Sequence, residues 1–389
     1  MLIFSMLPFS SKKFFLLFAV IIATGLVVGK YFSRYISLRN YLLAVTILYI
    51  TFFFPEPLHA FIFVAYCYTI YYVFNYLLKP NVKLLGCALL VLPMVLIKIS
   101  VKDMGFISLA GLSYITFRVV QIYFDNNRNY SPRPVSPFDF FLFMLFPPTI
   151  LIGPIDRFNR FKSDLDSGFG KIDGEKITKA LNDFALGVMQ KFILAEFVGR
   201  MWLSKINPAS THLSDMVNMM YAYSVYLYFD FAGYSNMAVG MGKMLGIDVP
   251  FNFNHPYFSV NPQDFWRRWN ATLGDWLRDY IFIPYYKWIS GKKQLKKYPL
   301  FRQNSGLFLT FTLMGFWNGF EKPFIISGVL FGIYSVIHNT YVRTCQKKGK
   351  DVVFGNLSHQ WVKVISVLIM FNFVCFALYI FSGNFPYIH

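Results

Sequence analysis

Long apolar runs separated by short polar or basic loops dominate the pattern of hydrophobic and polar positions along the chain. Runs of this length without strict alternation predict helices buried on most of their surface rather than strands. The pattern predicts such helical runs at 14–28, 41–54, 60–78, 84–97, 106–123, 138–152, 176–203, 216–246, 307–317, 324–337 and 362–381.

Polar residues and prolines interrupt two of these runs. The run 106–123 carries Ser113, Thr116, Arg118 and Gln121, which predicts a helix that faces the protein interior. The run 138–152 contains Pro147-Pro148, which predicts a kinked or re-entrant element. Such backbone is tolerated at membrane depth only inside protein or beside a wet cavity.

One stretch, 264–288, has the strongest amphipathic pattern and predicts a continuous helix. Seven apolar residues share one face: Phe265, Trp266, Trp269, Leu273, Trp276, Leu277 and Tyr280. Six charged residues share the other: Asp264, Arg267, Arg268, Asp275, Arg278 and Asp279. A helix of this kind suits the membrane interface or the wall of a polar cavity, and a surface helix without chemistry is the alternative.

The composition places this pattern in a membrane protein. Of 389 residues, 56% are hydrophobic and 14% are charged, whereas soluble proteins average about 25% charged residues. We expect one all-α, polytopic integral-membrane domain over 1–389, with no metal site, because no His, Asp or Glu cluster has ligand spacing. The four cysteines, which show no CxxC spacing, predict buried thiols.

The net charge of +18 comes from 37 Lys and Arg against 19 Asp and Glu. These basic residues are scattered between apolar runs, which disfavours nucleic acid as a partner and favours cytoplasmic loops near anionic membrane lipids. The strongest cytoplasmic marker is the loop that carries Lys292, Lys293, Lys296, Lys297 and Arg302.

Six segments, in their order and spacing, resemble the membrane-bound O-acyltransferase family. They are LSYITFRVVQIYFD (112–125), FPPTILIGPIDRFNRF (146–161), YSVYLYFDFAGYSNMAVGMGKMLGI (223–247), PFNFNHPYFS (250–259), DFWRRWNATLGDWLRDYIFIP (264–284), and MGFWNGF with VLFGIYSVIHN (314–339). The resemblance covers about 105–340. It implies a ring of about 10 to 12 transmembrane and re-entrant helices around a funnel or tunnel, in a bacterial inner membrane.

The resemblance also implies a reaction, the transfer of an acyl group from a thioester to a hydroxyl. It is strongest to members that act in teichoic acid D-alanylation. That type implies a phosphopantetheine thioester on a small acidic carrier protein as donor, and an extracytoplasmic polymer or relay protein as acceptor. The basic loops suit an acidic carrier, although they are equally explained as topology determinants. O-acetylation of an exopolysaccharide or of peptidoglycan is the alternative within the family.

Two positions depart from the pattern that the resemblance implies. Bacterial members carry His after the RRW of the amphipathic stretch and in an FWHG segment, and here both are Asn: Asn270 and Asn318, 48 residues apart. The second His is the one taken as catalytic. An imidazole can accept a hydroxyl proton near neutral pH, but an amide does not titrate.

Three hypotheses follow from this departure. In the first, His338 supplies the missing base. In the second, Asn318 and Asn270 position the reactants and stabilise the oxyanion, and the activated thioester needs no protein base. In the third, the chain is a degenerate member that binds without chemistry. A transporter is disfavoured, because the sequence shows no internal repeats.

Further polar residues are candidates for binding rather than catalysis. Asp230 is expected to form a structural ion pair with Arg267 or Lys243. The resemblance predicts a substrate-binding or carrier-binding role for six residues: Trp266, Arg267, Asp275, Arg278, Asp279 and Trp317.

Overall fold

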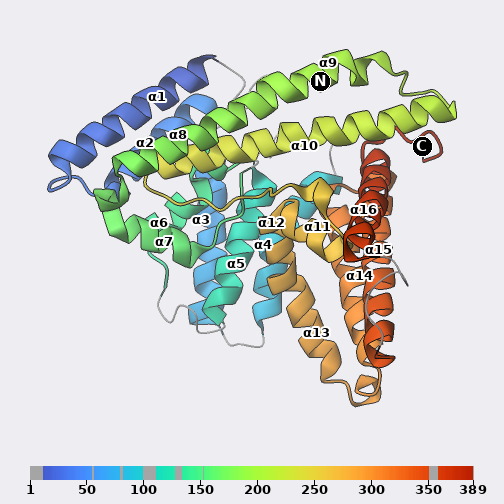
Figure 1. The fold of residues 1–389 in the computed structure, drawn as a ribbon. Helices are drawn as coiled ribbons and strands as arrows, with labels where there is room; N and C mark the ends of the chain where they lie inside the picture. The colour runs from blue at the N-terminus through green and yellow to red at the C-terminus, as the bar shows by residue number, and fades with distance from the viewer. Residues whose placement is uncertain are drawn as a thin grey trace. The chain divides into compact units, whose positions relative to one another are not determined.

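The structure is a computed structural model that describes residues 12–54, 57–78, 82–99, 111–127, 134–151, 153–349 and 358–388. Every regular element in this part of the chain is helical, which confirms the predicted all-α class (Figure 1). The α-helices are α1 Lys12–Val27, α2 Leu38–Phe53, α3 Pro57–Tyr72, α4 Lys83–Ile99, α5 Leu112–Asn127, α6 Pro137–Leu145, α7 Phe158–Ser167, α8 Gly174–Val188, α9 Glu196–Met201, α10 Leu213–Met244, α11 Pro262–Arg268, α12 Ala271–Leu277, α13 Ile283–Ser290, α14 Pro299–Asn318, α15 Lys322–Lys347 and α16 His359–Phe381.

Several of these helices are long and apolar enough to cross a membrane. Within the described residues, four meet this criterion by length and composition: Phe14–Phe32, Pro57–Leu77, Lys322–Lys347 and Gln360–Phe381. Leu38–Phe53 is a shorter apolar helix. The first part of the predicted run 106–123 lies outside the described residues. The polar segment 158–175 contains α7.

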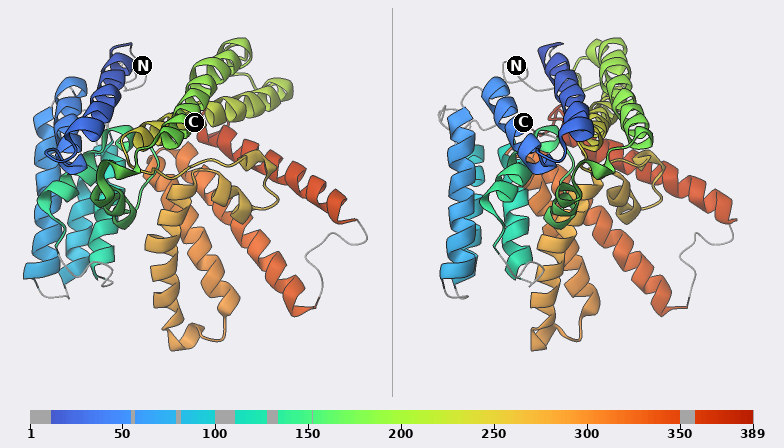
Figure 2. Two further views of the ribbon diagram at one scale, coloured as in Figure 1. Left: turned by 60° about the vertical axis from the view of Figure 1, so that its left-hand side comes forward. Right: turned by 90° about the vertical axis from the view of Figure 1, so that its left-hand side faces the viewer.

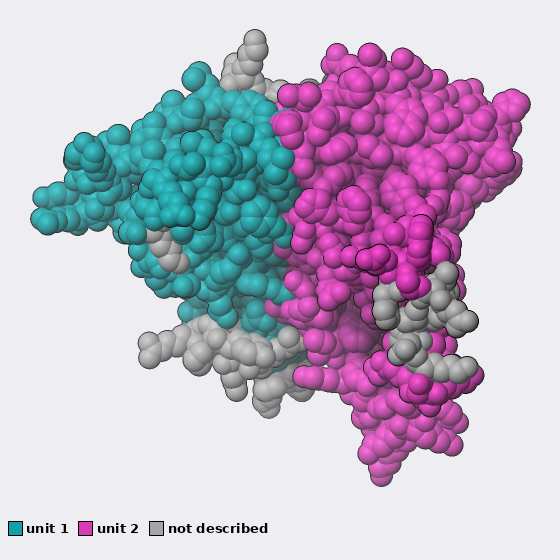
Figure 3. Space-filling model, in the orientation of Figure 1, with its two compact units in different colours: residues 1–188, 233–251 teal, residues 189–232, 252–389 magenta. Residues whose placement is uncertain are grey.

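The chain divides into two compact units (Figure 3). Unit 1 consists of Met1–Val188 and Gly233–Phe251, and unit 2 consists of Met189–Ala232 and Asn252–His389. The long helix α10 contributes its first part to unit 2 and its last part to unit 1. The two Asn positions and His338 all belong to unit 2.

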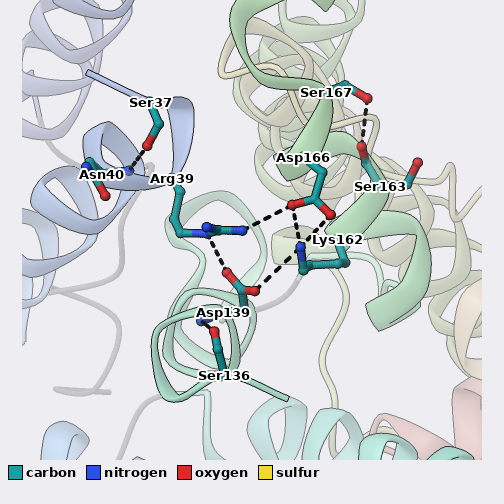
Figure 4. A network of polar contacts seen from close by, with 9 residues as sticks. All are labelled: Ser37, Arg39, Asn40, Ser136, Asp139, Lys162, Ser163, Asp166 and Ser167. Atoms are coloured by element: carbon teal, nitrogen blue, oxygen red, sulfur yellow. Dashed lines mark hydrogen bonds and ion pairs between the residues drawn. The ribbon is translucent and has the colours of Figure 1, made fainter. Parts of the chain in front are cut away.

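A network of four charged side chains ties three helices of unit 1 together (Figure 4). The Asp139 carboxylate, in the first turn of α6, lies 2.7 Å from Nε of Arg39 on α2 and 3.7 Å from Nζ of Lys162 on α7. The carboxylate of Asp166 on α7 also forms ion pairs with Arg39 and with Lys162. Asp139 is buried, while Arg39 and Lys162 keep about a third of their side chains exposed, so the network bridges the core and the surface of unit 1.

Buried Arg118 holds the proline turn that follows α6. Its guanidinium donates hydrogen bonds to the carbonyls of Phe143 (2.8 Å), Met144 (3.0 Å) and Thr149 (2.7 Å). The first two are carbonyls of the last turn of α6, left without a helical partner where the helix ends, and the third belongs to the short 3₁₀ segment Pro147–Thr149. The break at the prolines and the inward-facing role of α5 are both as predicted.

Two ion pairs inside the units differ from the sequence-based expectation. Asp230 pairs with Lys191, which is only 14% exposed, and Lys243 pairs with Asp183 at 2.7 Å. The predicted pairing of Asp230 with Lys243 or Arg267 is therefore wrong, although Asp230 does form an ion pair, as expected. Pairing between helices depends on tertiary packing, which a single helix pattern does not encode.

In unit 2, the helices α14 and α15 pack closely because two glycines face each other. A Cβ on Gly328 would lie 2.6 Å from the Phe311 carbonyl oxygen and 2.8 Å from Gly315 Cα. A Cβ on Gly315 would lie 2.6 Å from the Phe324 carbonyl oxygen. Only hydrogen fits at both positions, so the pair fixes the two backbones against each other just before α14 ends.

The predicted continuous helix over 264–288 is wrong, because the helix breaks between α11 and α12. Asn270 takes the left-handed conformation, with φ of 44°, and precedes the first residue of α12. Asn is among the few residues that adopt this conformation readily. The expected separation of faces holds for Phe265, Trp269 and Leu273, which are buried, and for Arg267, which is exposed. It is wrong for Asp264, which was expected on the polar face and is buried.

The segment from residue 252 to residue 254 stabilises this break. The Asn254 N–H donates to the Arg268 carbonyl at 2.9 Å, and the Ala271 N–H donates to the Asn252 carbonyl at 3.0 Å. The buried Asn252 side chain also accepts from Thr272 N at 3.2 Å and from Thr272 Oγ1 at 2.6 Å. Asn252 thus caps α12 from outside the helix, in place of Asn270, whose side chain makes no cap. We call these contacts the Asn252 clamp.

We predict that Asn252→Ala destabilises unit 2 by about 1–2 kcal/mol, because α12 loses its cap and a buried hydroxyl loses its acceptor. Asn254→Ala is the matched control, since the one side-chain hydrogen bond of Asn254 within the described residues is to exposed His255 and its backbone bond to Arg268 is kept. Thermal unfolding of the purified chain in detergent measures both. Equal melting temperatures for the two variants would contradict a capping role for Asn252.

We also predict that Asp139→Ala destabilises unit 1 by about 1–2 kcal/mol, since it removes the buried acceptor of Arg39 and Lys162. The partial exposure of these two cations keeps the effect below that of a fully buried pair. Glu175→Ala, which breaks the exposed pair with Lys179, serves as the control and should leave the unfolding curve unchanged. The network carries no stability if both variants melt like the wild type.

Candidate functional site

Asn270 presents an uncommitted amide at the start of α12. Its carbonyl accepts from Leu273 N at 3.0 Å and from Gly274 N at 3.1 Å. Its side chain, however, makes no hydrogen bond within the described part of the chain. The residue is only 6% exposed. A buried amide with unused donors and an unused acceptor can bind a carbonyl or hydroxyl of a ligand.

An aromatic cluster holds the residue that precedes Asn270. The Trp269 ring packs edge-on against Phe253 (5.2 Å between centroids) and stacks on Phe265 (5.6 Å). Tyr257 lies 6.0 Å away and donates its hydroxyl to the Ser224 carbonyl at 2.5 Å. These contacts bury the chain on one side of Asn270 and restrict how far its backbone can move.

Asn318 is the last residue of α14 and is half-buried. Its side-chain nitrogen donates to the Met314 carbonyl at 2.9 Å, one turn earlier in the same helix. That contact uses one of the two amide hydrogens and leaves the side-chain oxygen as an acceptor. Asn318 can therefore orient a hydroxyl or donate one further hydrogen bond, but it cannot carry a proton away.

The antiparallel packing of α14 brings Asn318 to the same level as Asn270. Gly306 of α14 packs against the Phe282 ring, since a Cβ there would lie 2.9 Å from it. Asn270 precedes Phe282 by 12 residues, and Asn318 follows Gly306 by 12 residues. At about 1.5 Å per residue, Asn270 and Asn318 each lie about 18 Å from this contact, toward the same end of the hairpin that α13 and α14 form. Their levels along the hairpin therefore agree to within about one turn.

The structure does not bring His338 to this level. His338 lies 16 residues beyond the first residue of α15, which is about 24 Å along the helix. Its neighbour Asn339 donates to Asn304 at 2.7 Å, and Asn304 donates to Thr340 at 2.8 Å. Asn304 in turn lies 14 residues before Asn318, or about 21 Å. His338 lines a separate, mostly apolar cavity between α15 and α16.

The two predicted tryptophans have different surroundings. Trp266 of α11 packs on the rings of Phe311 (5.3 Å) and Phe331 (4.9 Å), so it joins α11 to α14 and α15. Trp317 is half-buried in the last turn of α14, next to Asn318. Arg267 projects outward with 76% of its side chain exposed. A binding role for these three residues stays a prediction.

Asp275, Arg278 and Asp279 form a partly exposed charge cluster. The Arg278 guanidinium lies 2.6 Å from the Asp275 carboxylate and 2.9 Å from that of Asp279. The hydrogen bond to Asp279 and the attraction of both carboxylates raise the pKa of Arg278 above its usual value, so it stays charged. Because the charges largely satisfy one another, the predicted carrier contact would have to compete with these pairs.

Asn252 is the site residue for which the sequence predicted no role. It belongs to the segment 250–259 that carries part of the family resemblance, and it is a polar residue between two phenylalanines. This position could have indicated a structural role for Asn252, because a polar side chain in an aromatic run is expected to have a buried hydrogen-bond partner. Within the described residues, no group of three or more His, Cys, Asp or Glu could hold a metal ion.

Comparisons with known proteins agree with this architecture. The sequence profile of the membrane-bound O-acyltransferase family matches residues 58–382. The chain is 33% identical to the teichoic acid D-alanyltransferase of Bacillus subtilis (strain 168), over 99% of this chain and 100% of that protein. It is 34% identical to the teichoic acid D-alanyltransferase of Lacticaseibacillus rhamnosus, over 70% of this chain and 68% of that one.

The similarity extends to O-acetyl transferring relatives over a shorter part of the sequence. The peptidoglycan O-acetyltransferase of Helicobacter pylori (strain ATCC 700392 / 26695) is 33% identical over 63% of this chain and 44% of its own length. With its apolar helices and a family match over most of its length, the chain is a multi-span membrane protein that belongs to the membrane-bound O-acyltransferase family.

Proposed function

We propose that this chain transfers a D-alanyl group from a carrier-bound thioester to a hydroxyl of a cell-envelope polymer or of a relay partner. One observation carries the proposal: the similarity to the teichoic acid D-alanyltransferase of Bacillus subtilis runs through the whole of both chains. O-acetyl transfer is the second candidate, and it rests on relatives that the chain matches over less than half of their length.

The reaction is centred on the level that Asn270 and Asn318 share. The acceptor hydroxyl attacks the thioester carbonyl, the carbon–sulfur bond breaks, and the hydroxyl proton ends on the departing sulfur. The free amide of Asn270 is suited to donate to the oxyanion that develops, which is where hydrogen-bond donors contribute most to rate. The unused oxygen of Asn318 is suited to orient the attacking hydroxyl.

The lack of an imidazole at Asn318 sets the expected rate. A positioned general base contributes typically about 10²–10⁴-fold, so transfer by this chain is expected to be slow compared with relatives that carry His. The thioester is an activated donor, which is why transfer can proceed without such a base. Since His338 lies about 24 Å along α15 from the Asn318 end of the hairpin, the displaced-base hypothesis has the weaker geometric support.

The donor in this proposal is a phosphopantetheine thioester on an acidic carrier protein. Exposed lysines gather at the α13–α14 loop, where they offer a complementary docking surface: Lys287, Lys292, Lys293, Lys296 and Lys297. The helix α14 rises about 28 Å from its start at Pro299 to Asn318. A donor arm delivered from this loop therefore has to span that length to reach the asparagines.

We predict that proteoliposomes of the wild type transfer labelled D-alanine from a loaded carrier, and that Asn318→Ala reduces transfer by about 10²-fold. Asn318→His should increase the rate, because it introduces a titrating base. His338→Ala, checked for normal folding by its melting temperature, should leave the rate within about twofold of the wild type.

Each other outcome selects a different account. Loss of transfer in a folded His338→Ala variant would establish the displaced base and contradict the role assigned to the asparagines. A silent wild type that Asn318→His activates would show that the natural chain is a degenerate member. Transfer of labelled acetyl but not of labelled D-alanyl would favour O-acetylation.

A further inference from the structure

The helices α15 and α16 touch at one end and separate toward the other. Ser327 Oγ donates to the Ala377 carbonyl at 2.9 Å, and the rings of Tyr334 and Phe373 stack with centroids 4.8 Å apart. Figure 2 shows the two helices spreading from this contact toward the end of α15 and the start of α16. Since both are long enough to cross a membrane, the space between them lies within reach of lipid.

A cavity of about 680 Å³ fills this wedge, which is a size typical of ligand sites. Three parts of unit 2 line it: α15 with His338 and Tyr341, α16 with Lys363 and Ser366, and the segment 260–262 at the start of α11. Most of the lining is apolar. The Nδ1 atom of His338 is buried and has no hydrogen-bond partner within the described residues, so the cavity contains a polar group without a protein ligand.

Positive charge gathers where the wedge opens. Lys363 is exposed and lines the cavity one turn into α16. Lys347 and Lys348 lie at the end of the antiparallel neighbour α15, whereas Arg343 faces α14, where it donates to Gln303 at 3.1 Å. In the described ranges, no carboxylate lies within ion-pair distance of Lys347, Lys348 or Lys363. An anionic group at Lys363 would therefore not have to compete with a protein carboxylate.

We propose that this cavity binds one anionic phospholipid, with an acyl chain between α15 and α16 and the phosphate at Lys363. Charge complementarity and an apolar interior together identify the ligand, because basic pockets between membrane helices are typical sites for anionic headgroups. A zwitterionic phospholipid has the same acyl chains, but its headgroup brings less net negative charge to the mouth of the cavity. Neither Asn270 nor Asn318 lines this cavity, so the proposal does not rest on the proposed acyl transfer.

Native mass spectrometry of the full-length chain in detergent tests this site, with phosphatidylglycerol or phosphatidylcholine added. Lys363→Gln is expected to weaken phosphatidylglycerol binding by about fivefold and to leave phosphatidylcholine unchanged, the effect of one cation near a headgroup. Ser366→Phe fills the cavity and should remove binding of both lipids. Lys205→Gln, an exposed lysine outside the cavity, is the matched control and should bind as the wild type does.

Several results would overturn the proposal. Wild-type phosphatidylglycerol binding in both Lys363→Gln and Ser366→Phe would do so directly. An equal loss of both lipids in Lys363→Gln would remove the selectivity for anionic lipid. If Ser366→Phe changes the oligomeric state and not lipid binding, a second copy of the chain occupies the wedge. If Ser366→Phe misfolds, the comparison of phosphatidylglycerol binding by Lys363→Gln and by Lys205→Gln still tests the proposal.

Discussion

The hydrogen bonds that Asn252 makes to Thr272 are the constraint on which the candidate site depends. They cap α12 from a distant part of the sequence, and so allow Asn270 to take a left-handed conformation without supplying a cap itself. Its amide is thereby left without a protein partner in a nearly buried position. If 264–288 formed one continuous helix, Asn270 would lie in the helix interior. Its backbone carbonyl and N–H would then form only the regular helical hydrogen bonds.

The hairpin formed by α13 and α14 extends this constraint to the second asparagine. The contact between Phe282 and Gly306 sets the register, and the register brings Asn318 to the level of Asn270. Two neutral amides can bind, orient and stabilise charge, but they cannot move a proton at neutral pH. In the proposed function, these two amides therefore supply positioning and charge stabilisation without a titrating base.

Much of the helical framework could be predicted from the sequence, because apolar runs determine where helices lie in a membrane protein. The proline break after α6 and the inward role of Arg118 also followed from local residues. The break at Asn270 did not, since its stabilising partner Asn252 is 18 residues away and the amphipathic pattern continues through it. The partners of Asp230 and Lys243, and the separation of His338 from Asn318, depend on tertiary packing that no local pattern encodes.

The separation of His338 from Asn318 is the most direct test of where chemistry can occur. Spin labels on Asn318→Cys and His338→Cys, in a chain whose four native cysteines are replaced by alanine, allow the distance to be measured by double electron–electron resonance. The account predicts a distribution centred at about 24 Å or longer, whereas a main peak below about 15 Å would place His338 near Asn318 and contradict it.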